Sequence, residues 1–178
     1  MSTQTALLVI DVQVGLITGP AYRGPEVLAN IAALLARARA AGVAVIYMQH
    51  DGDEGSKLAP GAPGWAIHPS VIPLNGEIAI RKRASDSFYE TTLQAELEAR
   101  HIQHLVITGC RTEMCVDTTS RVAISRGYNV TLVADAHSTV DNELLSAAQI
   151  VAHHNVTLDD FGTDEHVVVI KKTDDVTF

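Results

Sequence analysis

The stretch that decides the fold is residues 104–134, HLVITGCRTEMCVDTTSRVAISRGYNVTLVA. Its apolar run at 105–108 predicts a buried strand, which a glycine-containing turn follows. Residues 114–126 predict a helix that ends at a glycine, and residues 129–134 predict the next strand. Two strands joined by a helix favour a parallel pair with a right-handed crossover.

The rest of the chain repeats this alternation of short apolar runs and helical patterns. Further strands are predicted at residues 6–10, 43–48, 77–80 and 167–170, and further helices at residues 25–41, 90–100 and 143–153. The ALLVI run at 6–10 is apolar on both faces, as strands of a parallel sheet are. We therefore expect one domain over residues 1–178, with three α/β/α layers around a six-stranded, mostly parallel, Rossmann-like sheet.

One segment, residues 51–73, interrupts the alternation. It contains eight glycines and prolines, so it predicts a long ordered loop rather than a helix or strand. Loops of this length in compact domains are usually functional or disordered. Trp65 lies in the middle of it and either covers the core or forms a wall of a pocket.

Composition excludes several classes of function. The chain has 178 residues and a net charge of −8, so it lacks the basic surface that nucleic-acid binding needs. No run approaches the roughly 20 apolar residues of a membrane span, and the N-terminus does not resemble a signal peptide, so we expect a cytoplasmic protein without a membrane partner. Phosphate-binding glycine motifs are absent, which predicts no nucleotide cofactor.

Chemically different side chains follow the predicted strands. Asp11 and Gln13 come after the first strand, Lys82 after the third, and Cys115 after the fourth. The carboxyl ends of parallel strands meet at one edge of a sheet, where ligands bind. Asp11 taken alone is a common turn or cap residue, and Lys82 alone is part of a solvated basic patch. Together they predict a catalytic site.

Cys115 is the candidate nucleophile of this site. It lies where a strand passes through a tight turn into a helix, and unpaired N–H groups at a helix start favour a thiolate. The Lys82 cation would act in the same direction, so we expect a lowered pKa for this thiol. Asp11 would then serve as general base and acid, and backbone N–H groups of the turn would receive an oxyanion.

The chain resembles the isochorismatase-like cysteine hydrolases, the superfamily that includes nicotinamidases. Four segments carry the resemblance: LLVIDVQVGL at 7–16, KRASDSFYETTL at 82–93, VITGCRTEMCVDTTSRVAISRGYNV at 106–130, and VADAHST at 133–139. They occur in the order expected for the family, and the third is the most specific.

The resemblance implies roles for particular residues. It makes Asp11 the acid/base, Lys82 the partner cation and Cys115 the nucleophile. It also implies a cis peptide bond between Cys110 and Arg111, which aims the backbone N–H groups of Arg111 and Cys115 at the oxyanion. The implied assembly is a homodimer or larger homo-oligomer.

Metal binding is not expected. Nicotinamidases carry Asp-x-His and a further His after the second strand, whereas this chain has QHDGDEGSKL at 49–58. His50 and His68 could in principle ligate a metal, but a hydrogen-bonded or exposed pair is the better interpretation of their spacing.

The expected function is hydrolysis of an amide-type C–N bond in a small molecule, through a covalent Cys115 intermediate. Substrate-binding candidates are Gln13, Trp65, Phe88 and His137. Two alternatives remain: isochorismatase-type vinyl-ether cleavage, which needs an acid but no nucleophile, and a catalytically silent binding protein on the same fold.

Overall fold

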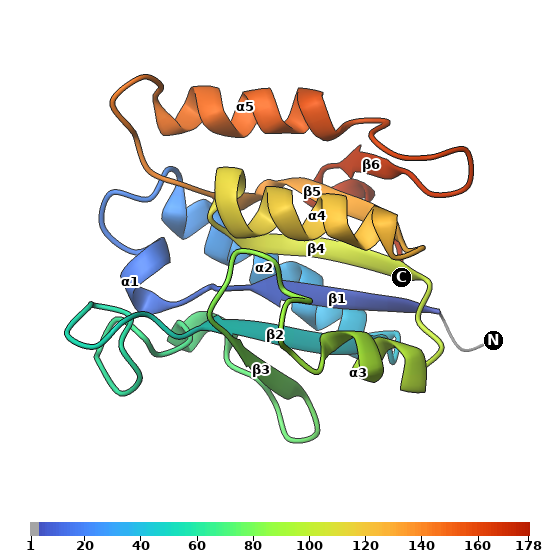
Figure 1. The fold of residues 1–178 in the computed structure, drawn as a ribbon, viewed down its shortest axis with the longest axis horizontal. Coiled ribbons are helices and arrows are strands. Elements are labelled where there is room, and N and C mark those ends of the chain that lie inside the picture. Colours follow the sequence, from blue (N-terminus) through green and yellow to red (C-terminus); the bar gives the residue numbers. More distant parts are fainter. Residues whose placement is uncertain (1–3) are drawn as a thin grey trace.

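The centre of the molecule is a six-stranded parallel sheet, seen in a computed structural model that describes residues 4–178 (Figure 1). Its strands are β1 (Thr5–Ile10), β2 (Ala44–His50), β3 (Ile78–Lys82), β4 (His104–Cys110), β5 (Asn129–Ser138) and β6 (Val168–Lys171). They lie in the order β3-β2-β1-β4-β5-β6, and every neighbouring pair runs parallel. The α/β fold predicted from the sequence is confirmed, and this sheet is parallel throughout rather than mostly.

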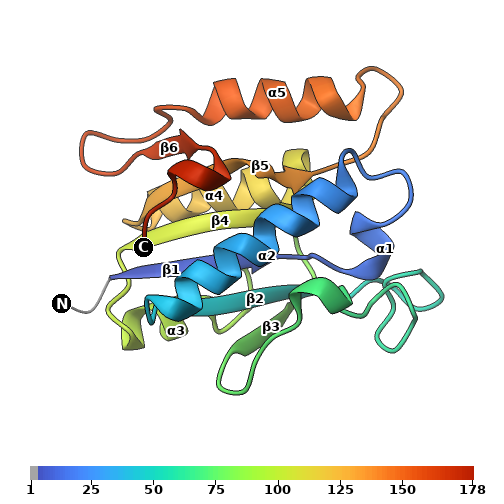
Figure 2. The ribbon, with the colours of Figure 1, turned by 180° about the vertical axis from the view of Figure 1, so that it is seen from behind.

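The helices form the two outer layers. They are α1 (Val14–Ile17), α2 (Gly24–Ala40), α3 (Leu93–Ala99), α4 (Asp117–Ser125) and α5 (Ala147–Leu158), with short 3-10 turns η1 (Pro69–Val71) and η3 (Thr173–Asp175) and a π-helical turn η2 (Thr112–Val116). Helix α2 covers one face, α3 and α4 cover the other, and α5 runs beside β5 and β6 (Figures 1 and 2). No helix within residues 4–178 has both the length and the apolar character to cross a bilayer.

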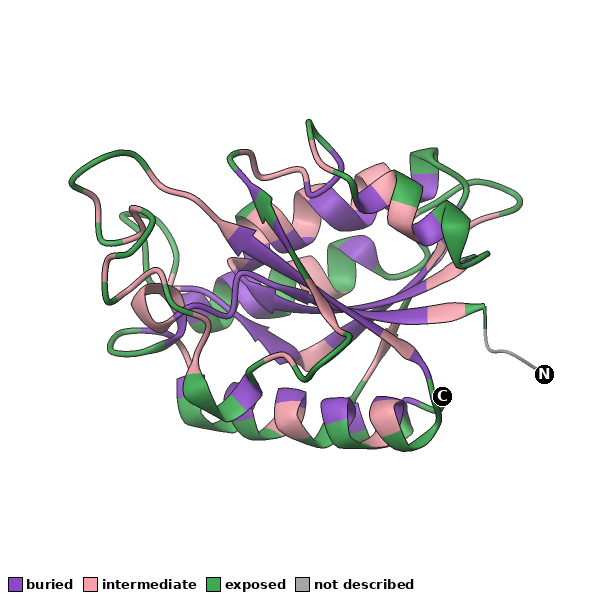
Figure 3. Cartoon of the chain, turned by 90° about the horizontal axis from the view of Figure 1, so that it is seen from below, coloured by how far each residue is buried: buried purple, intermediate pink, exposed green. Residues whose placement is uncertain are grey.

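The sheet separates two apolar cores, as Figure 3 shows by the buried strands between the helical layers. Alternate residues of β1 point to opposite faces. Leu7 and Val9 pack toward α2, whereas Leu8 and Ile10 pack toward α3 and α4. All four side chains are fully buried, which explains why the strand is apolar at every position after Thr5.

Several element boundaries differ from the sequence prediction. Helix α5 begins at Ala147 rather than 143, because Ser146 and Gln149 form a capping box that fixes its start. The segment predicted as one helix from 114 begins two residues earlier as the η2 turn. Helix α1, only four residues long, was not predicted, because so short a helix has no detectable periodicity.

The glycine- and proline-rich loop at 51–73 is ordered by backbone hydrogen bonds to the segment after β1. The N–H groups of Val14 and Gly15 donate to the carbonyls of Ala66 and Gly64, over 2.9 and 2.8 Å. The loop therefore returns to the carboxyl end of the sheet and closes over it.

Carboxyl ends of β1 and β4 lie side by side where the strand order reverses, and Gly109 permits their close approach. Its φ is +123°, and a Cβ there would lie 1.9 Å from the carbonyl oxygen of Ile10. Any side chain would push the two strands apart at the point from which Asp11 and Cys115 are displayed.

We predict that Gly109→Ala lowers the free energy of unfolding by at least about 3 kcal/mol, because it adds a backbone clash to an unfavourable φ. Gly42→Ala is the matched control, since Gly42 has φ +69° but open space around its Cβ position. It should cost only about 1–2 kcal/mol. Urea denaturation measures both, and equal losses would contradict the steric argument.

Candidate active site

Asp11 is the first residue after β1 and is fully buried. Its backbone is left-handed, with φ +50°, a conformation that aspartate tolerates better than most residues. Its N–H still donates to the carbonyl of Met48 over 3.0 Å, so the chain leaves the strand while held against β2. This turn places the carboxylate at the end of the sheet.

Lys82 is the last residue of β3 and takes a position where an apolar side chain would be expected. Ile80 and Lys82 are buried, while Arg81 between them is exposed, as strand alternation requires. The ammonium group donates to the carbonyl of Ala84 over 2.8 Å. The lysine is thereby turned inward, toward the ends of the central strands.

Cys115 lies in the η2 turn, between β4 and α4. The peptide bond that leaves β4, Cys110–Arg111, is cis. The carbonyl of Arg111 accepts hydrogen bonds from the N–H groups of Met114 and Val116, both over 3.1 Å. These bonds wind the turn around the sulfur-bearing residue, which is partly exposed.

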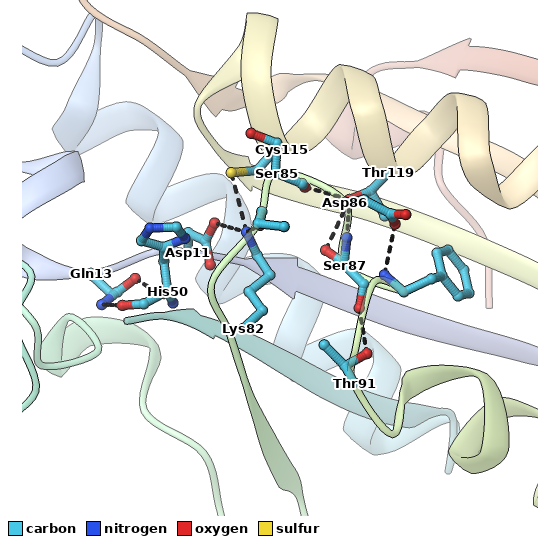
Figure 4. Close-up of polar contacts among 12 residues, drawn as sticks. Asp11, Gln13, His50, Lys82, Ser85, Asp86, Ser87, Thr91, Cys115 and Thr119 are labelled. Atoms are coloured by element: carbon cyan, nitrogen blue, oxygen red, sulfur yellow. Dashed lines mark hydrogen bonds and ion pairs between the residues drawn. The ribbon is translucent and has the colours of Figure 1, made fainter. Parts of the chain in front are cut away.

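The three side chains meet around the lysine ammonium (Figure 4). Lys82 Nζ lies 2.7 Å from Asp11 Oδ2 and 3.2 Å from Cys115 Sγ, and both charged side chains are completely shielded from solvent. The structure thus brings together the acid, cation and thiol that the sequence predicts from three different strand ends.

Burial and neighbouring charges shift the pKa values of Asp11 and Lys82 in opposing directions. Burial raises the pKa of Asp11 above its usual range, although Lys82 acts in the opposite direction. Burial alone would lower the pKa of Lys82, but the neighbouring Asp11 and Cys115 raise it above the ordinary value. The carboxylate is consequently a stronger base than an exposed aspartate, next to a lysine that keeps its charge.

The pKa of the Cys115 thiol differs from the value expected from the sequence. Burial, followed by the negative charge of Asp11, raises the pKa of Cys115 to about 11, and the opposing effect of Lys82 is smaller. The prediction of a lowered pKa was therefore wrong, because it considered the helix start and the cation but neither the burial of the thiol nor the carboxylate in the same pocket. The resting residue is a thiol that needs a base.

A cavity of about 440 Å³ opens onto Asp11 and Cys115. Loop residues 51–53 and 56–58 form one wall, and Arg111 and Met114 of the turn form another. Further lining residues are Leu16, His50, Arg83 and Ser85. The size suits a small molecule.

Gln13 and Trp65, two predicted substrate-binding residues, do not line this cavity. Gln13 is fully buried; its amide nitrogen donates to the carbonyls of His50 and Trp65 over 3.0 and 2.8 Å, and its oxygen accepts from the His50 N–H over 2.9 Å. The Trp65 indole donates to Asp51 over 2.8 Å. Both residues hold the loop that forms the wall.

Phe88 also lies away from the cavity. It is buried in the core and stacks on Tyr128 with ring centroids 6.0 Å apart. The neighbouring Ser87 exchanges hydrogen bonds with Thr119 of α4, over 2.9 and 3.2 Å (Figure 4). The segment after Lys82 is thus fastened to the helix that follows Cys115, which accounts for the serine and phenylalanine of this motif.

His137, the fourth candidate, is buried behind the η2 turn. Its ring nitrogens bond to Thr112 and Asn155 rather than facing the cavity. The sequence places His137 at the correct end of the sheet, but a register shift between β4 and β5 sets it beside Gly109, where its ring bonds to Thr112 and Asn155.

The two histidines considered as metal ligands have separate environments. His68 accepts a hydrogen bond from the Ser70 N–H at the start of η1, over 3.2 Å, and His50 lines the cavity. Residues 4–178 contain no group of three or more His, Cys, Asp or Glu side chains arranged to hold a metal ion. Burial lowers the pKa of His50, so its imidazole is neutral at neutral pH.

Most residues of the cavity wall were not among those predicted from the sequence to bind substrate. His50 ends β2, so the strand-end rule that found Asp11 applies to it equally; it was considered only as a metal ligand. Lys57 and Leu58 gave no such signal, because their place depends on how the long loop folds back. Met114 was hidden within a segment predicted as ordinary helix.

The sequence of this chain matches a known protein family and is similar to proteins named as hydrolases. An isochorismatase domain model matches residues 5–158. Streptothricin hydrolase of Streptomyces noursei is 44% identical over 139 residues, covering 76% of this chain but only 50% of that protein, so the chain spans about half the length of this relative. Ureidoacrylate amidohydrolase of Variovorax paradoxus is 27% identical over 206 residues, covering 90% and 81% of the two chains.

Solved structures named as isochorismatases have the same fold as this chain. The crystal structure of an isochorismatase from Pseudomonas putida superposes with a TM-score of 0.89 at 31% identity, over 97% of this chain and 90% of that one. The six-stranded parallel α/β sheet of this chain matches the fold of that solved isochorismatase, and the similar curated proteins are hydrolases by name. The chain belongs to the isochorismatase family.

We predict that the rate of Cys115 alkylation by iodoacetamide rises with pH to a midpoint near 11, above the roughly 8.5 of a free cysteine. Asp11→Asn should lower the midpoint, because it removes the negative charge that disfavours thiolate, and Lys82→Met should raise it. Cys115→Ala controls for reaction at buried Cys110. A wild-type midpoint at or below 8.5 would show that the thiol is preactivated.

We also predict that Gln13→Ala lowers the free energy of unfolding by about 3 kcal/mol, because it leaves buried groups of His50 without hydrogen-bond partners. Gln94→Ala, which removes a local bond to Glu98 on α3, should cost under about 1 kcal/mol. Chemical denaturation compares the two. A similar small loss in both would mean that Gln13 does not hold the loop.

Proposed function

We propose that this protein is a cysteine amidohydrolase that cleaves a C–N bond of a small molecule, with Cys115 as nucleophile. The observation that carries the proposal is the single ammonium group of Lys82 in contact with both Asp11 and Cys115, 2.7 and 3.2 Å away. A thiol and a base that line one cavity, with a fixed cation in contact with both, are the parts that acyl transfer requires.

In the first step, the Cys115 sulfur attacks the substrate carbonyl carbon while Asp11 takes the thiol proton. A buried carboxylate whose pKa is raised is suited to this transfer. Lys82 touches both atoms between which the negative charge moves, so the charge never leaves the neighbourhood of its counter-ion.

In the second step, the tetrahedral intermediate collapses. Its oxyanion would be received by the backbone N–H groups of Arg111 and Cys115, in the turn that follows the cis bond. Asp11 returns its proton to the leaving nitrogen, the C–N bond breaks, and an acyl-thioester remains. Water, activated by the same carboxylate, then hydrolyses the thioester and restores the thiol.

Two further features support amide chemistry. The relatives named streptothricin hydrolase and ureidoacrylate amidohydrolase are hydrolases, the second of them an amidohydrolase by name. The second feature is the presence of both an acid and a thiol at one site, because vinyl-ether cleavage needs only an acid and a binding protein needs neither.

The association into homo-oligomers and the cytoplasmic location expected from the sequence stay predictions.

We predict that Cys115→Ala, Asp11→Asn and Lys82→Met each lower kcat on a small amide by at least about 10³-fold. The substrates to screen are streptothricin, ureidoacrylate and simple carboxamides, with ammonia or amine release as the signal. Lys171→Met, at the end of edge strand β6 and outside the cavity, is the matched lysine control and should retain activity.

The alternatives give different outcomes in the same assay. Vinyl-ether hydrolysis that survives Cys115→Ala would replace the amidohydrolase proposal. Amide hydrolysis that survives this substitution would exclude the covalent route.

A further inference from the structure

His137 is a buried histidine that the proposed mechanism does not use. It belongs to β5, directly beside Gly109 of β4, and is 1% exposed. Its Nδ1 lies 2.8 Å from Thr112 Oγ1, and its Nε2 lies 2.9 Å from Asn155 Oδ1. It therefore joins α5 to the η2 turn that carries Cys115.

Ala134, Asn155, His137 and Thr112 are joined by a series of hydrogen bonds. The direction of each bond follows from the Ala134 carbonyl at one end of the series. The Ala134 carbonyl can only accept, so it receives the Asn155 amide N–H over 3.1 Å. The Asn155 oxygen is then turned toward His137 and must accept from the Nε2–H. Because burial lowers the pKa of His137 to about 4, the ring carries one proton, and Nδ1 is left as an acceptor. The Thr112 hydroxyl must donate to it.

This orientation fixes the residue at which the η2 turn begins. Thr112 is fully buried and immediately follows Arg111, whose carbonyl holds the turn through two N–H groups. The turn is thus held by its own backbone bonds, by the Lys82–Cys115 contact and by the Thr112 side chain, and of these the Thr112 side chain connects it to β5 and α5.

We propose that His137 is a positioning residue that holds the Thr112 hydroxyl, and through it sets the direction of the oxyanion-binding N–H groups of Arg111 and Cys115. The inference rests on the proposed function, because it assigns those N–H groups a role in acyl transfer. It gives His137 no contact with substrate.

Two reactions of the same thiol separate this role from a purely structural one. Acylation of Cys115 by p-nitrophenyl acetate forms an S–C bond, passes through a tetrahedral oxyanion and expels p-nitrophenolate, with the thiol proton going to Asp11. Alkylation by iodoacetamide displaces iodide at a saturated carbon and forms no oxyanion. Mispositioned N–H groups therefore slow acylation but not alkylation.

Thr112→Val, which removes the hydroxyl at nearly constant volume, should slow acylation by about tenfold or more and change alkylation less than twofold. Outright loss of one oxyanion donor costs about 10²–10³. Thr112→Ser keeps the hydroxyl and should retain most of the acylation rate. Thr139→Val is the matched control, since Thr139 is also buried but its hydroxyl has no hydrogen-bond partner among residues 4–178.

Substitutions of the histidine test which nitrogen matters. His137→Asn retains an oxygen near the Nδ1 position and should acylate within about threefold of wild type. His137→Gln places its amide near Nε2, toward Asn155, and should lose as much as Thr112→Val.

Three results would overturn the inference. Equal slowing of both reactions by Thr112→Val would show a general structural role, and unchanged acylation would show no role. Better acylation by His137→Gln than by His137→Asn would exclude the Thr112 route. Failure of the proposed function looks different, because wild-type protein would then release p-nitrophenolate no faster than Cys115→Ala.

Discussion

The site depends on one buried ion pair, between Asp11 and Lys82, whose side chains are wholly shielded from solvent. A buried charge that loses its partner costs about 3–5 kcal/mol, so neither residue can be changed without disturbing the other. The same pair sets the state of the thiol, because the carboxylate and burial keep Cys115 protonated until substrate arrives. Reactivity is therefore supplied by proton transfer during attack rather than by a resting thiolate.

The surrounding structure serves to hold three strand ends in register around that pair. Gly109 lets β4 lie against β1, and the Ser87–Thr119 bonds join the segment after Lys82 to the helix after Cys115. Gln13 holds His50 and the returning loop, so the cavity wall is built on the same strand end as the base. The acid, the cation, the thiol and the cavity wall are thus all held by the joined carboxyl ends of the strands.

The sequence predicts the fold and the three central residues because both follow from short-range patterns. Apolar runs specify a parallel sheet, and parallel strands bring their carboxyl ends to one edge. It failed for Phe88 and Trp65 because an aromatic side chain near a site serves equally as core or wall. The sequence also did not predict the raised pKa of Cys115, because that pKa depends on how deeply the thiol is buried and on the Asp11 charge beside it, which are properties of packing rather than of spacing.

The most direct test of this account is the ionisation state of Asp11, measured from its carboxyl ¹³C chemical shift as a function of pH. The account predicts a carboxylate at neutral pH, with a pKa above the ordinary aspartate range in the wild type and higher still in Lys82→Met, where burial acts without the cation. A neutral carboxyl group at pH 7 in the wild type, or a titration that Lys82→Met leaves unchanged, would contradict it.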